Sequence, residues 1–169
     1  MKLQQQKRIL ITGIPGMGKT TLGNLFESKK GFVHLDMETH PKEHLLLESN
    51  REEFMNLIIC KDKDFIITFG FYPPNCTGEV KYLRDQGFIL IWLDGNRDAA
   101  YRSYKTRTEK QDHLNLQLHL EAFNMQIERI ERTGVVKEIE PIIVNTFDSE
   151  GNFRDIVDVA QEIISFQGE

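Results

Sequence analysis

The apolar positions of the chain follow two alternating patterns, short runs rich in β-branched residues and longer stretches with helical spacing. The short runs predict strands at 8–12, 32–36, 65–69, 88–93 and 141–145. The longer stretches predict helices at 19–30, 41–60, 79–86, 116–133 and 154–166. Strands that alternate with helices are typical of a parallel sheet covered on both faces, so we expect an α/β fold.

Length and charge narrow the class of protein. The chain has 169 residues and no change of composition that would mark a linker, so a single domain over 1–169 is expected. Lys and Arg number 21 against 26 Asp and Glu, a net charge of −5. This balance argues against a protein that coats nucleic acid or an anionic membrane, and any polyanion must meet a local basic patch.

Cysteine usage and the apolar runs predict a reducing compartment. Cys60 and Cys76 lie outside any spacing typical of a disulfide framework or a zinc site, so buried reduced thiols are expected. The apolar run at 9–11 ends at once at Thr12-Gly13, too soon for a signal peptide. No apolar run approaches ~18 residues, so no spanning helix is expected. These features predict a cytoplasmic protein without a membrane partner.

Residues 13–20, GIPGMGKT, match the phosphate-binding pattern GxxxxGK[ST] at every fixed position, between a predicted strand and a predicted helix. Glycines let backbone N–H groups turn toward phosphate oxygens, and the following helix adds its positive end. Lys19 is expected to contact the β- and γ-phosphates, and the Thr20 hydroxyl to be a ligand of Mg²⁺. No guanine-reading NKxD motif follows, so we expect ATP. The predicted nucleotide-binding residues of this segment are Gly13, Gly16, Met17, Gly18, Lys19, Thr20 and Thr21.

On these residues the chain resembles the small-molecule kinases of the P-loop class, the group that includes adenylate kinase, shikimate kinase and gluconate kinase. The resemblance covers nearly the whole length, although only the loop at 13–20 is specific by itself. It implies a three-layer α/β/α P-loop fold with a five-stranded parallel sheet and a short lid at about 97–113. The cofactors that it implies are ATP and Mg²⁺.

An acidic pair, Asp36 and Glu38, ends the second predicted strand, at the carboxyl edge where open α/β sheets bind ligands. In shikimate and gluconate kinases an acidic residue in this region contacts the acceptor hydroxyl or a metal-bound water. The resemblance makes Asp36 the candidate catalytic carboxylate, with Glu38 as the alternative. Such a group would orient the nucleophile more than deprotonate it, because phosphoryl transfer requires mainly positioning and charge stabilisation. A structural alternative is that Asp36 only caps the following segment.

Segment 69–74 resembles the DGFPR stretch of nucleoside monophosphate kinases, with two departures. Phe69 replaces the acid, which removes the usual Walker B carboxylate. Pro74 replaces the arginine that would grip an acceptor's phosphate, which weakens the case for a nucleotide acceptor. The aromatic pair Phe71 and Tyr72 is open to two interpretations, stacking on a ligand ring or packing into the core.

Five cations follow the fourth predicted strand of this otherwise acidic chain: Arg97, Arg102, Lys105, Arg107 and Lys110. By the resemblance, this segment is a lid that closes on the triphosphate and excludes water. Arg102 would stack on adenine and Arg107 would reach the transferring phosphoryl group, with Lys105 as the alternative. A charge run of this kind can also be a solvated helix face.

Two further pairs bear on ligands. Asn145 and Thr146 follow the fifth strand and correspond to the loop that lines adenine in these kinases. His40 and His44 lie four residues apart without a third ligand at a plausible spacing, so no metal site is expected there.

The function predicted from the sequence is transfer of the γ-phosphoryl group of ATP to a small-molecule hydroxyl or phosphate, with Mg²⁺. The acceptor could be a nucleoside, a nucleotide, a sugar acid or another polyol, and the sequence leaves that choice and the oligomeric state open. Two alternatives stay open as well. One is a nucleotide-binding switch that phosphorylates nothing small, which the missing acid at 69 favours. The other is a kinase of nucleic-acid ends, against which the acidic net charge argues.

Overall fold

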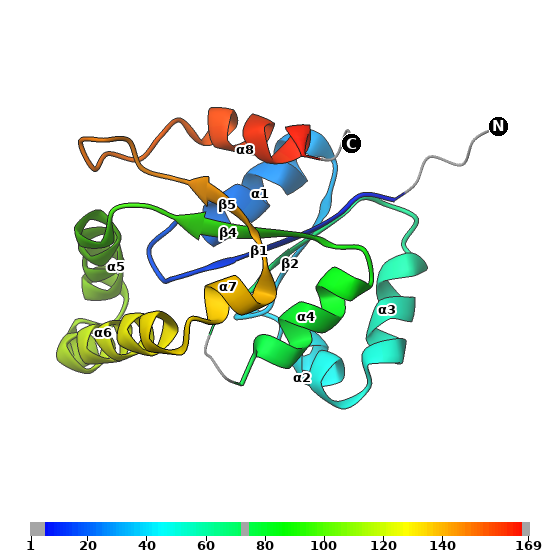
Figure 1. Cartoon of the computed structure of the whole chain (residues 1–169), viewed down its shortest axis with the longest axis horizontal. Coiled ribbons are helices and arrows are strands. Elements are labelled where there is room, and N and C mark those ends of the chain that lie inside the picture. The colour runs from blue at the N-terminus through cyan, green and yellow to red at the C-terminus, as the bar shows by residue number, and fades with distance from the viewer. Residues whose placement is uncertain (1–5, 72–74, 167–169) are drawn as a thin grey trace.

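The computed structural model describes residues 6–71 and 75–166, and its centre is a five-stranded sheet (Figure 1). The strands are β1 (Arg8–Gly13), β2 (Val33–Asp36), β3 (Phe65–Thr68), β4 (Ile89–Asp94) and β5 (Ile142–Asn145). They lie in the order β2-β3-β1-β4-β5, and every neighbouring pair is parallel. The chain therefore changes sides of the central strand β1 between β3 and β4. Ligands of open parallel sheets bind at the carboxyl ends of the strands beside such a change of direction.

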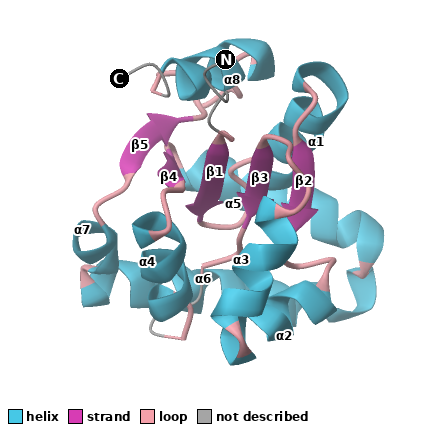
Figure 2. Cartoon of the chain, turned by 90° about the vertical axis from the view of Figure 1, so that its right-hand side faces the viewer, coloured by secondary structure: helices cyan, strands magenta, loops and turns pink. Residues whose placement is uncertain are grey.

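Helices cover both faces of this sheet (Figure 2). On one face lie α1 (Lys19–Lys30) and α8 (Ile156–Ser165), and on the other lie α3 (Arg51–Ile59), α4 (Thr77–Asp85) and α7 (Val135–Ile139). α2 (Pro41–Ser49) packs against α3. Beyond the carboxyl ends of the strands, α5 (Arg97–Gln111) and α6 (Leu116–Thr133) pack together, joined by a 3₁₀ turn at His113–Asn115. This is the three-layer α/β/α arrangement that the sequence predicts.

The predicted strands and most of the predicted helices are confirmed within two residues, with three differences. The basic segment after β4 forms the helix α5, which the apolar spacing does not predict. The stretch 41–60 forms two helices, because the chain turns at Asn50. The Asn50 side-chain oxygen accepts a hydrogen bond from the backbone N–H of Glu53 (3.3 Å) and so begins α3. The sequence pattern also does not predict α7, whose five residues lie between Gly134 and Glu140, both at positive φ. Little more than one helical turn is too short to show a period.

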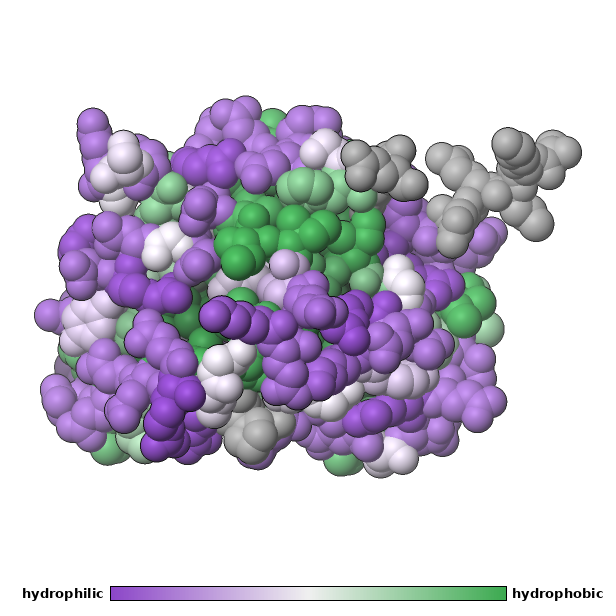
Figure 3. Space-filling view, in the orientation of Figure 1, coloured by the Kyte–Doolittle hydropathy of each residue, from purple (hydrophilic) through white to green (hydrophobic). Residues whose placement is uncertain are grey.

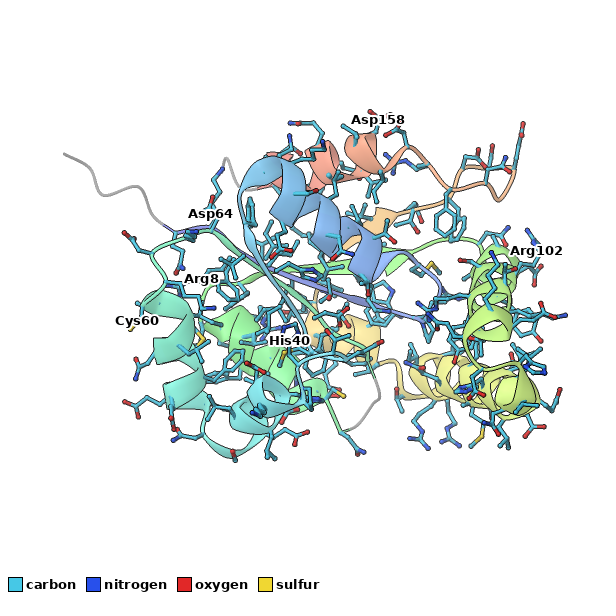
Figure 4. The ribbon with its side chains drawn as sticks, turned by 180° about the vertical axis from the view of Figure 1, so that it is seen from behind. Arg8, His40, Cys60, Asp64, Arg102 and Asp158 are labelled. Atoms are coloured by element: carbon cyan, nitrogen blue, oxygen red, sulfur yellow. The ribbon has the colours of Figure 1, made fainter. Side chains whose placement is uncertain are left out.

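The strand runs are buried because helices cover both faces of the sheet. Ile11, Ile67 and Leu93, from three neighbouring strands, have no exposed surface. The prediction of two buried thiols is wrong for Cys60, which is exposed at the C-terminal end of α3, on the periphery of the molecule (Figure 4). Cys76 is buried as predicted. Cys60 follows the last residue of α3, where the helix has already left the core.

Apolar surface gathers over the β5 edge of the sheet, beneath α8 (Figure 3). Ile143 is 53% exposed, because β5 is an edge strand with a sheet neighbour on one side. Across residues 6–71 and 75–166, none of the helices combines the length and the apolar composition needed to cross a bilayer.

Candidate active site

The glycine-rich loop at 13–20 joins β1 to α1 and packs against the end of β4 and the first turn of α5. Gly13, Gly16 and Gly18 all have positive φ angles, of 139°, 81° and 87°. A Cβ atom at Gly13 would lie 2.6 Å from the carbonyl oxygen of Leu93, and one at Gly16 would lie 2.3 Å from that of Ala100. Both the backbone conformation and the close packing require glycine, as a phosphate-cradling loop would.

The start of α1 supplies a positive potential to this loop. The helix begins at Lys19, directly after the left-handed Gly18, and its first turn holds no acidic residue. Its last turn holds Lys29 and Lys30, which suit the negative end of the helix. The positive end of the helix dipole therefore faces the loop without a neutralising carboxylate in the first turn of α1, which favours an anionic ligand.

Lys19 is buried behind the loop, and its Nζ donates hydrogen bonds to the carbonyl oxygens of Gly13 (3.2 Å) and Ile14 (3.0 Å). Burial lowers the pKa of its ammonium group from 10.5 to about 8. The carboxylate of Glu38 opposes this lowering, and the charge of Arg107 adds to it. The pKa of Lys19 thus shows that a carboxylate after β2 and a guanidinium on α5 both act on this one ammonium group.

Thr20 and Asp36 form the contact at the mouth of the loop. The Thr20 Oγ1 donates a hydrogen bond to Asp36 Oδ2 (2.8 Å), and the backbone N–H of Glu38 donates to Asp36 Oδ1 (3.1 Å). Asp36 is only 6% exposed, so its carboxylate is fixed between the end of β2 and the first turn of α1. The capping role is present too, since the Asp36 carbonyl oxygen accepts the N–H groups of Thr39 and His40. The turn after β2 uses the carbonyl oxygen and Oδ1 of Asp36, and Oδ2 is left directed at Thr20.

These two side chains supply the oxygen donors that a magnesium ion requires. A hydroxyl and a carboxylate are hard ligands, and Mg²⁺ in phosphate sites takes one or two such protein ligands with water and phosphate oxygens. The residue pair Thr20 and Asp36 therefore fits this ion. The described part of the chain holds no group of three His, Cys, Asp or Glu side chains suited to a metal. His40 and His44 instead contact the Asp36 carbonyl oxygen (2.8 Å) and Glu48 (3.4 Å).

The end of β3 carries no carboxylate. Thr68 is buried, and its Oγ1 lies 2.9 Å from Nε2 of His34. Phe69, which follows it, is 1% exposed and packs edge-on against the ring of His44, with centroids 5.2 Å apart. The carboxylate that faces the glycine-rich loop therefore belongs to Asp36, at the end of β2, and β3 supplies none.

A cavity of about 360 Å³ opens beside the loop, on the side of α5 and α8. Of the predicted residues, it is lined by Gly16, Met17, Gly18, Thr21, Arg107 and Thr146. Thr146 is held by a hydrogen bond from its backbone N–H to the Asp94 carbonyl oxygen (3.0 Å). Residues of the loop at 13–21, of the segment 97–113 and of the segment after β5 thus converge on one cavity.

The sequence does not predict two further residues that line this cavity, Phe153 and Arg154. Phe153 is 51% exposed, and its ring lies 4.3 Å from that of Phe147, centroid to centroid. Between them the chain makes the polar turn 148–152, closed by a single antiparallel bridge. Two phenylalanines that flank a polar turn are a weak signal, and no motif marks them.

Gly13, Lys19 and Thr20 belong to the loop but do not line this cavity, and the two residues predicted beside the adenine base, Arg102 and Asn145, also lie outside it. Arg102 lines a neighbouring depression with Gly151 and Phe153, and Figure 4 shows it on α5 at the opposite end of the molecule from Cys60. The Asn145 side chain is exposed, and the backbone carbonyl oxygen of Asn145 accepts a hydrogen bond from Nη1 of Arg154 (2.6 Å). Neither side chain is among the residues that line the 360 Å³ cavity.

A second cavity, of about 680 Å³, lies on the side of β2, β3 and α2. Its lining residues are Met37, Glu38, Pro41, His44, Leu45, Glu48, Phe69, Gly70 and Cys76. Met37 and Glu38 directly follow Asp36 in the chain, so this cavity lies beside the end of β2. Phe71 is fully buried against Trp92, with ring centroids 5.5 Å apart, so of its two interpretations the structure bears out core packing. Tyr72 and Pro74 lie outside the described residues.

Comparison with known proteins reveals similarity to kinases. No family model matches the sequence. The chain is 38% identical over 64 residues to an adenylate kinase isoenzyme 6 homolog of Dictyostelium discoideum, and the match spans 37% of this chain and 37% of that protein.

Solved structures of similar fold cover nearly the whole chain. A shikimate kinase from Bacteroides thetaiotaomicron has a TM-score of 0.59 at 18% identity, over 96% of this chain and 99% of that one. A shikimate kinase from Acinetobacter baumannii in complex with shikimate has a TM-score of 0.57 at 18% identity, over 98% and 94%. A gluconokinase from Sinorhizobium meliloti 1021 has a TM-score of 0.54 at 13% identity, over 98% and 100%. The chain therefore has the fold of the P-loop small-molecule kinases, and the predicted resemblance is confirmed at that level.

Proposed function

We propose that the protein is an ATP-dependent phosphotransferase that moves the γ-phosphoryl group of ATP to a small-molecule acceptor with Mg²⁺. The observation that carries this proposal is the hydrogen bond of 2.8 Å between Thr20 and Asp36, which joins the glycine-rich loop to a buried carboxylate. A carboxylate in this place can help to hold a metal ion and can orient an attacking hydroxyl group. The kinase fold of the similar structures supports the same class of reaction.

Nucleotide binding is assigned to the loop at 13–21. Its backbone N–H groups and the Lys19 ammonium would hold the β- and γ-phosphates, and Thr20 with Asp36 would hold the magnesium ion. Bound Mg²⁺ neutralises charge on the phosphates as the phosphoryl group moves. The 360 Å³ cavity has room for the base, with Phe153 as an aromatic face and Thr146 at its inner wall. Arg102 and Asn145 lie outside this lining, so Phe153 takes the stacking role predicted for Arg102.

Residues 97–113 form the lid of this proposal, within one domain that covers the chain. Arg107 lines the nucleotide cavity, and its guanidinium lies over the ring of Tyr104, 5.4 Å from the centroid. The positive charge of Arg107 also lowers the pKa of Lys19, so the guanidinium acts on the ammonium group of the glycine-rich loop. A planar guanidinium is suited to the oxygens of a moving phosphoryl group, so Arg107 stabilises charge during transfer.

The 680 Å³ cavity is the acceptor site of the proposal. Asp36 stands between it and the glycine-rich loop, where it would orient the acceptor's hydroxyl group toward the γ-phosphorus. One of the structures similar in fold holds shikimate, which supports a small polar molecule as the acceptor.

A nucleotide-binding switch is the second candidate. It is favoured by β3, which ends in Thr68 and the buried Phe69 without the carboxylate expected of a kinase. Such a protein would bind ATP and hydrolyse it slowly without transferring phosphate to a small molecule.

The test is ADP release from ATP and Mg²⁺ by the purified protein, alone and with pools of nucleosides, nucleoside monophosphates, sugar acids, amino sugars and neutral polyols. Lys19→Ala is the blank, because it removes the buried ammonium. The proposal expects one pool to raise the rate at least about tenfold in the wild type only. ATP binding without stimulation by any pool favours the switch, and absence of ATP binding refutes both candidates.

A further inference from the structure

The 680 Å³ cavity beside Asp36 has an apolar floor and an acidic rim. Met37 and Phe69, from the segments that follow β2 and β3, are 3% and 1% exposed and form the floor. The ionisable groups of the rim are the carboxylates of Glu38 and Glu48 and the imidazole of His44. The two carboxylates outnumber the one imidazole, so the lining is negative whether or not His44 is protonated.

The lining holds neither lysine nor arginine in the part of the chain that the structure describes. Lys42, on α2, is exposed and does not line the cavity, and three cations of neighbouring elements have other partners. Arg51 donates to Glu79 (3.1 Å) and lies over the ring of Tyr82, 5.2 Å from its centroid. Lys19 donates to carbonyl oxygens of its own loop. Arg107 lines the nucleotide cavity instead.

This charge distribution separates the possible acceptors. A carboxylate or phosphate group inside the cavity would lose hydration and meet two carboxylates without a guanidinium or ammonium to pair with. A protonated amine would gain a partner, and the carbon skeleton that carries it could lie on Met37 and Phe69. The acidic rim thus favours acceptors with a protonated amine over acceptors with a carboxylate or phosphate group. The apolar floor can contact the carbon skeleton of the acceptor.

We propose that the acceptor is a small hydroxyl compound that carries a protonated amine, of the amino alcohol or amino sugar class, and that Glu48 pairs with this amine. This inference rests on the proposed phosphotransferase function. The backbone N–H of Glu38 donates to Asp36 Oδ1 (3.1 Å), so Glu38 lies at the phosphate end of the cavity, whereas Glu48, on α2, is left for the distal end of the acceptor. Glu48 contacts His44 (3.4 Å), its neighbour one turn earlier on α2, and an ammonium group would displace this contact.

The reaction balances without a further reactant. The acceptor's hydroxyl oxygen forms a bond to the γ-phosphorus, and the bond from this phosphorus to the β,γ-bridging oxygen breaks. ADP leaves with the electron pair of that bond. The hydroxyl proton passes to the Asp36 carboxylate and from there to water, and the amine keeps its proton throughout.

The experiment compares acceptors that share a carbon skeleton and differ in charge. With the full chain, ATP and Mg²⁺, kcat/KM is measured for glucosamine, glucose and gluconate, and for serinol, glycerol and glycerate. The dissociation constants of the same compounds are measured on the complex with a non-hydrolysable ATP analogue. The amine of at least one set is expected to exceed its acid at least about tenfold in one of these two quantities.

Three variants locate the preference. Glu48→Gln is expected to raise the KM or dissociation constant of the amine about threefold to tenfold, since the carboxylate is half exposed, and to leave the KM of ATP unchanged. Glu52→Gln removes an exposed carboxylate of α3 that does not line the cavity, and it is expected to change neither value. Glu48→Lys is expected to shift the preference toward the acids.

The inference is overturned if the acid equals or exceeds its amine in both quantities and in both sets, or if neither amine binds to the nucleotide complex. A Glu48→Lys protein with an unchanged preference overturns the role of Glu48. Failure of the proposed function gives a different result, because no compound of either set, whatever its charge, would then raise the release of ADP from ATP.

Discussion

Replacement of Lys19 by methionine tests whether burial in the glycine-rich loop lowers the pKa of the Lys19 ammonium group. The Nζ atom is buried and its pKa is lowered by burial from 10.5 to about 8. Lowering the pKa by this amount corresponds to about 3 kcal/mol of unfavourable free energy for the charged form in the folded protein. The folded state therefore loses the Lys19 proton at lower pH than the unfolded state does.

The sign of the effect follows from proton binding. Between pH 8 and 10.5 the unfolded chain holds more protons at Lys19 than the folded chain, so the free energy of unfolding of the wild type rises with pH. Lys19→Met has no such group. The stability of the wild type relative to Lys19→Met should therefore rise by about 2 kcal/mol from pH 7.5 to 9.5. The lost hydrogen bonds to Gly13 and Ile14 add an offset of about 1 kcal/mol each that does not vary with pH.

The assay is urea unfolding at several pH values, followed by the fluorescence of Trp92, the one tryptophan of the sequence, which is 1% exposed. Lys30→Met, at the exposed end of α1, is the control for removal of a lysine. Other groups titrate in this range in all three proteins, so only differences between them are compared. A difference between wild type and Lys19→Met that stays constant from pH 7.5 to 9.5 would refute the lowered pKa of Lys19 and the burial argued from it.

Three further changes test the site. Gly16→Ala should lower the free energy of unfolding by more than about 3 kcal/mol and abolish ATP binding, because the new Cβ would lie 2.3 Å from a carbonyl oxygen. Gly31→Ala, at a similar positive φ in open space, should cost about 1–2 kcal/mol, and equal losses in thermal unfolding would contradict the crowding. Asp36→Asn should lower kcat about 100-fold while ATP still binds, and unchanged turnover would remove Asp36 from the mechanism. Arg107→Ala should lower kcat at least about tenfold, whereas Arg102→Ala should change it less than about twofold, and the reverse order in steady-state kinetics would contradict the cavity lining.

Most of the fold could be predicted from the sequence because its signals are local. The β-branched runs and the glycine-rich loop each depend on residues that are close together in the chain, and both lie where the pattern puts them. The break of 41–60 at Asn50 is a capping contact that hydrophobic spacing does not report. The exposure of Cys60 depends on where α3 ends relative to the core, which composition cannot indicate.

The candidate site could be predicted only in part, for the same reason. Lys19, Thr20 and Asp36 were predictable because a motif and the end of a strand mark them, and they lie together. Phe153 reaches the 360 Å³ cavity through the turn at 148–152, whose path follows from tertiary packing. The charge of the 680 Å³ cavity depends on α2 lying beside the end of β3, which sequence order does not give. The cytoplasmic location and the individual site roles stay predictions.

The central claim is that the phosphoryl group leaves ATP for a small organic molecule, and ³¹P NMR of the reaction mixture tests it most directly. The protein is incubated with ATP, Mg²⁺ and the amino sugar and amino alcohol probes, with Lys19→Ala in parallel. The proposed mechanism predicts a new phosphomonoester signal that grows as ADP forms, in the wild type alone. ADP that forms together with inorganic phosphate only, whichever hydroxyl compound is present, would contradict it.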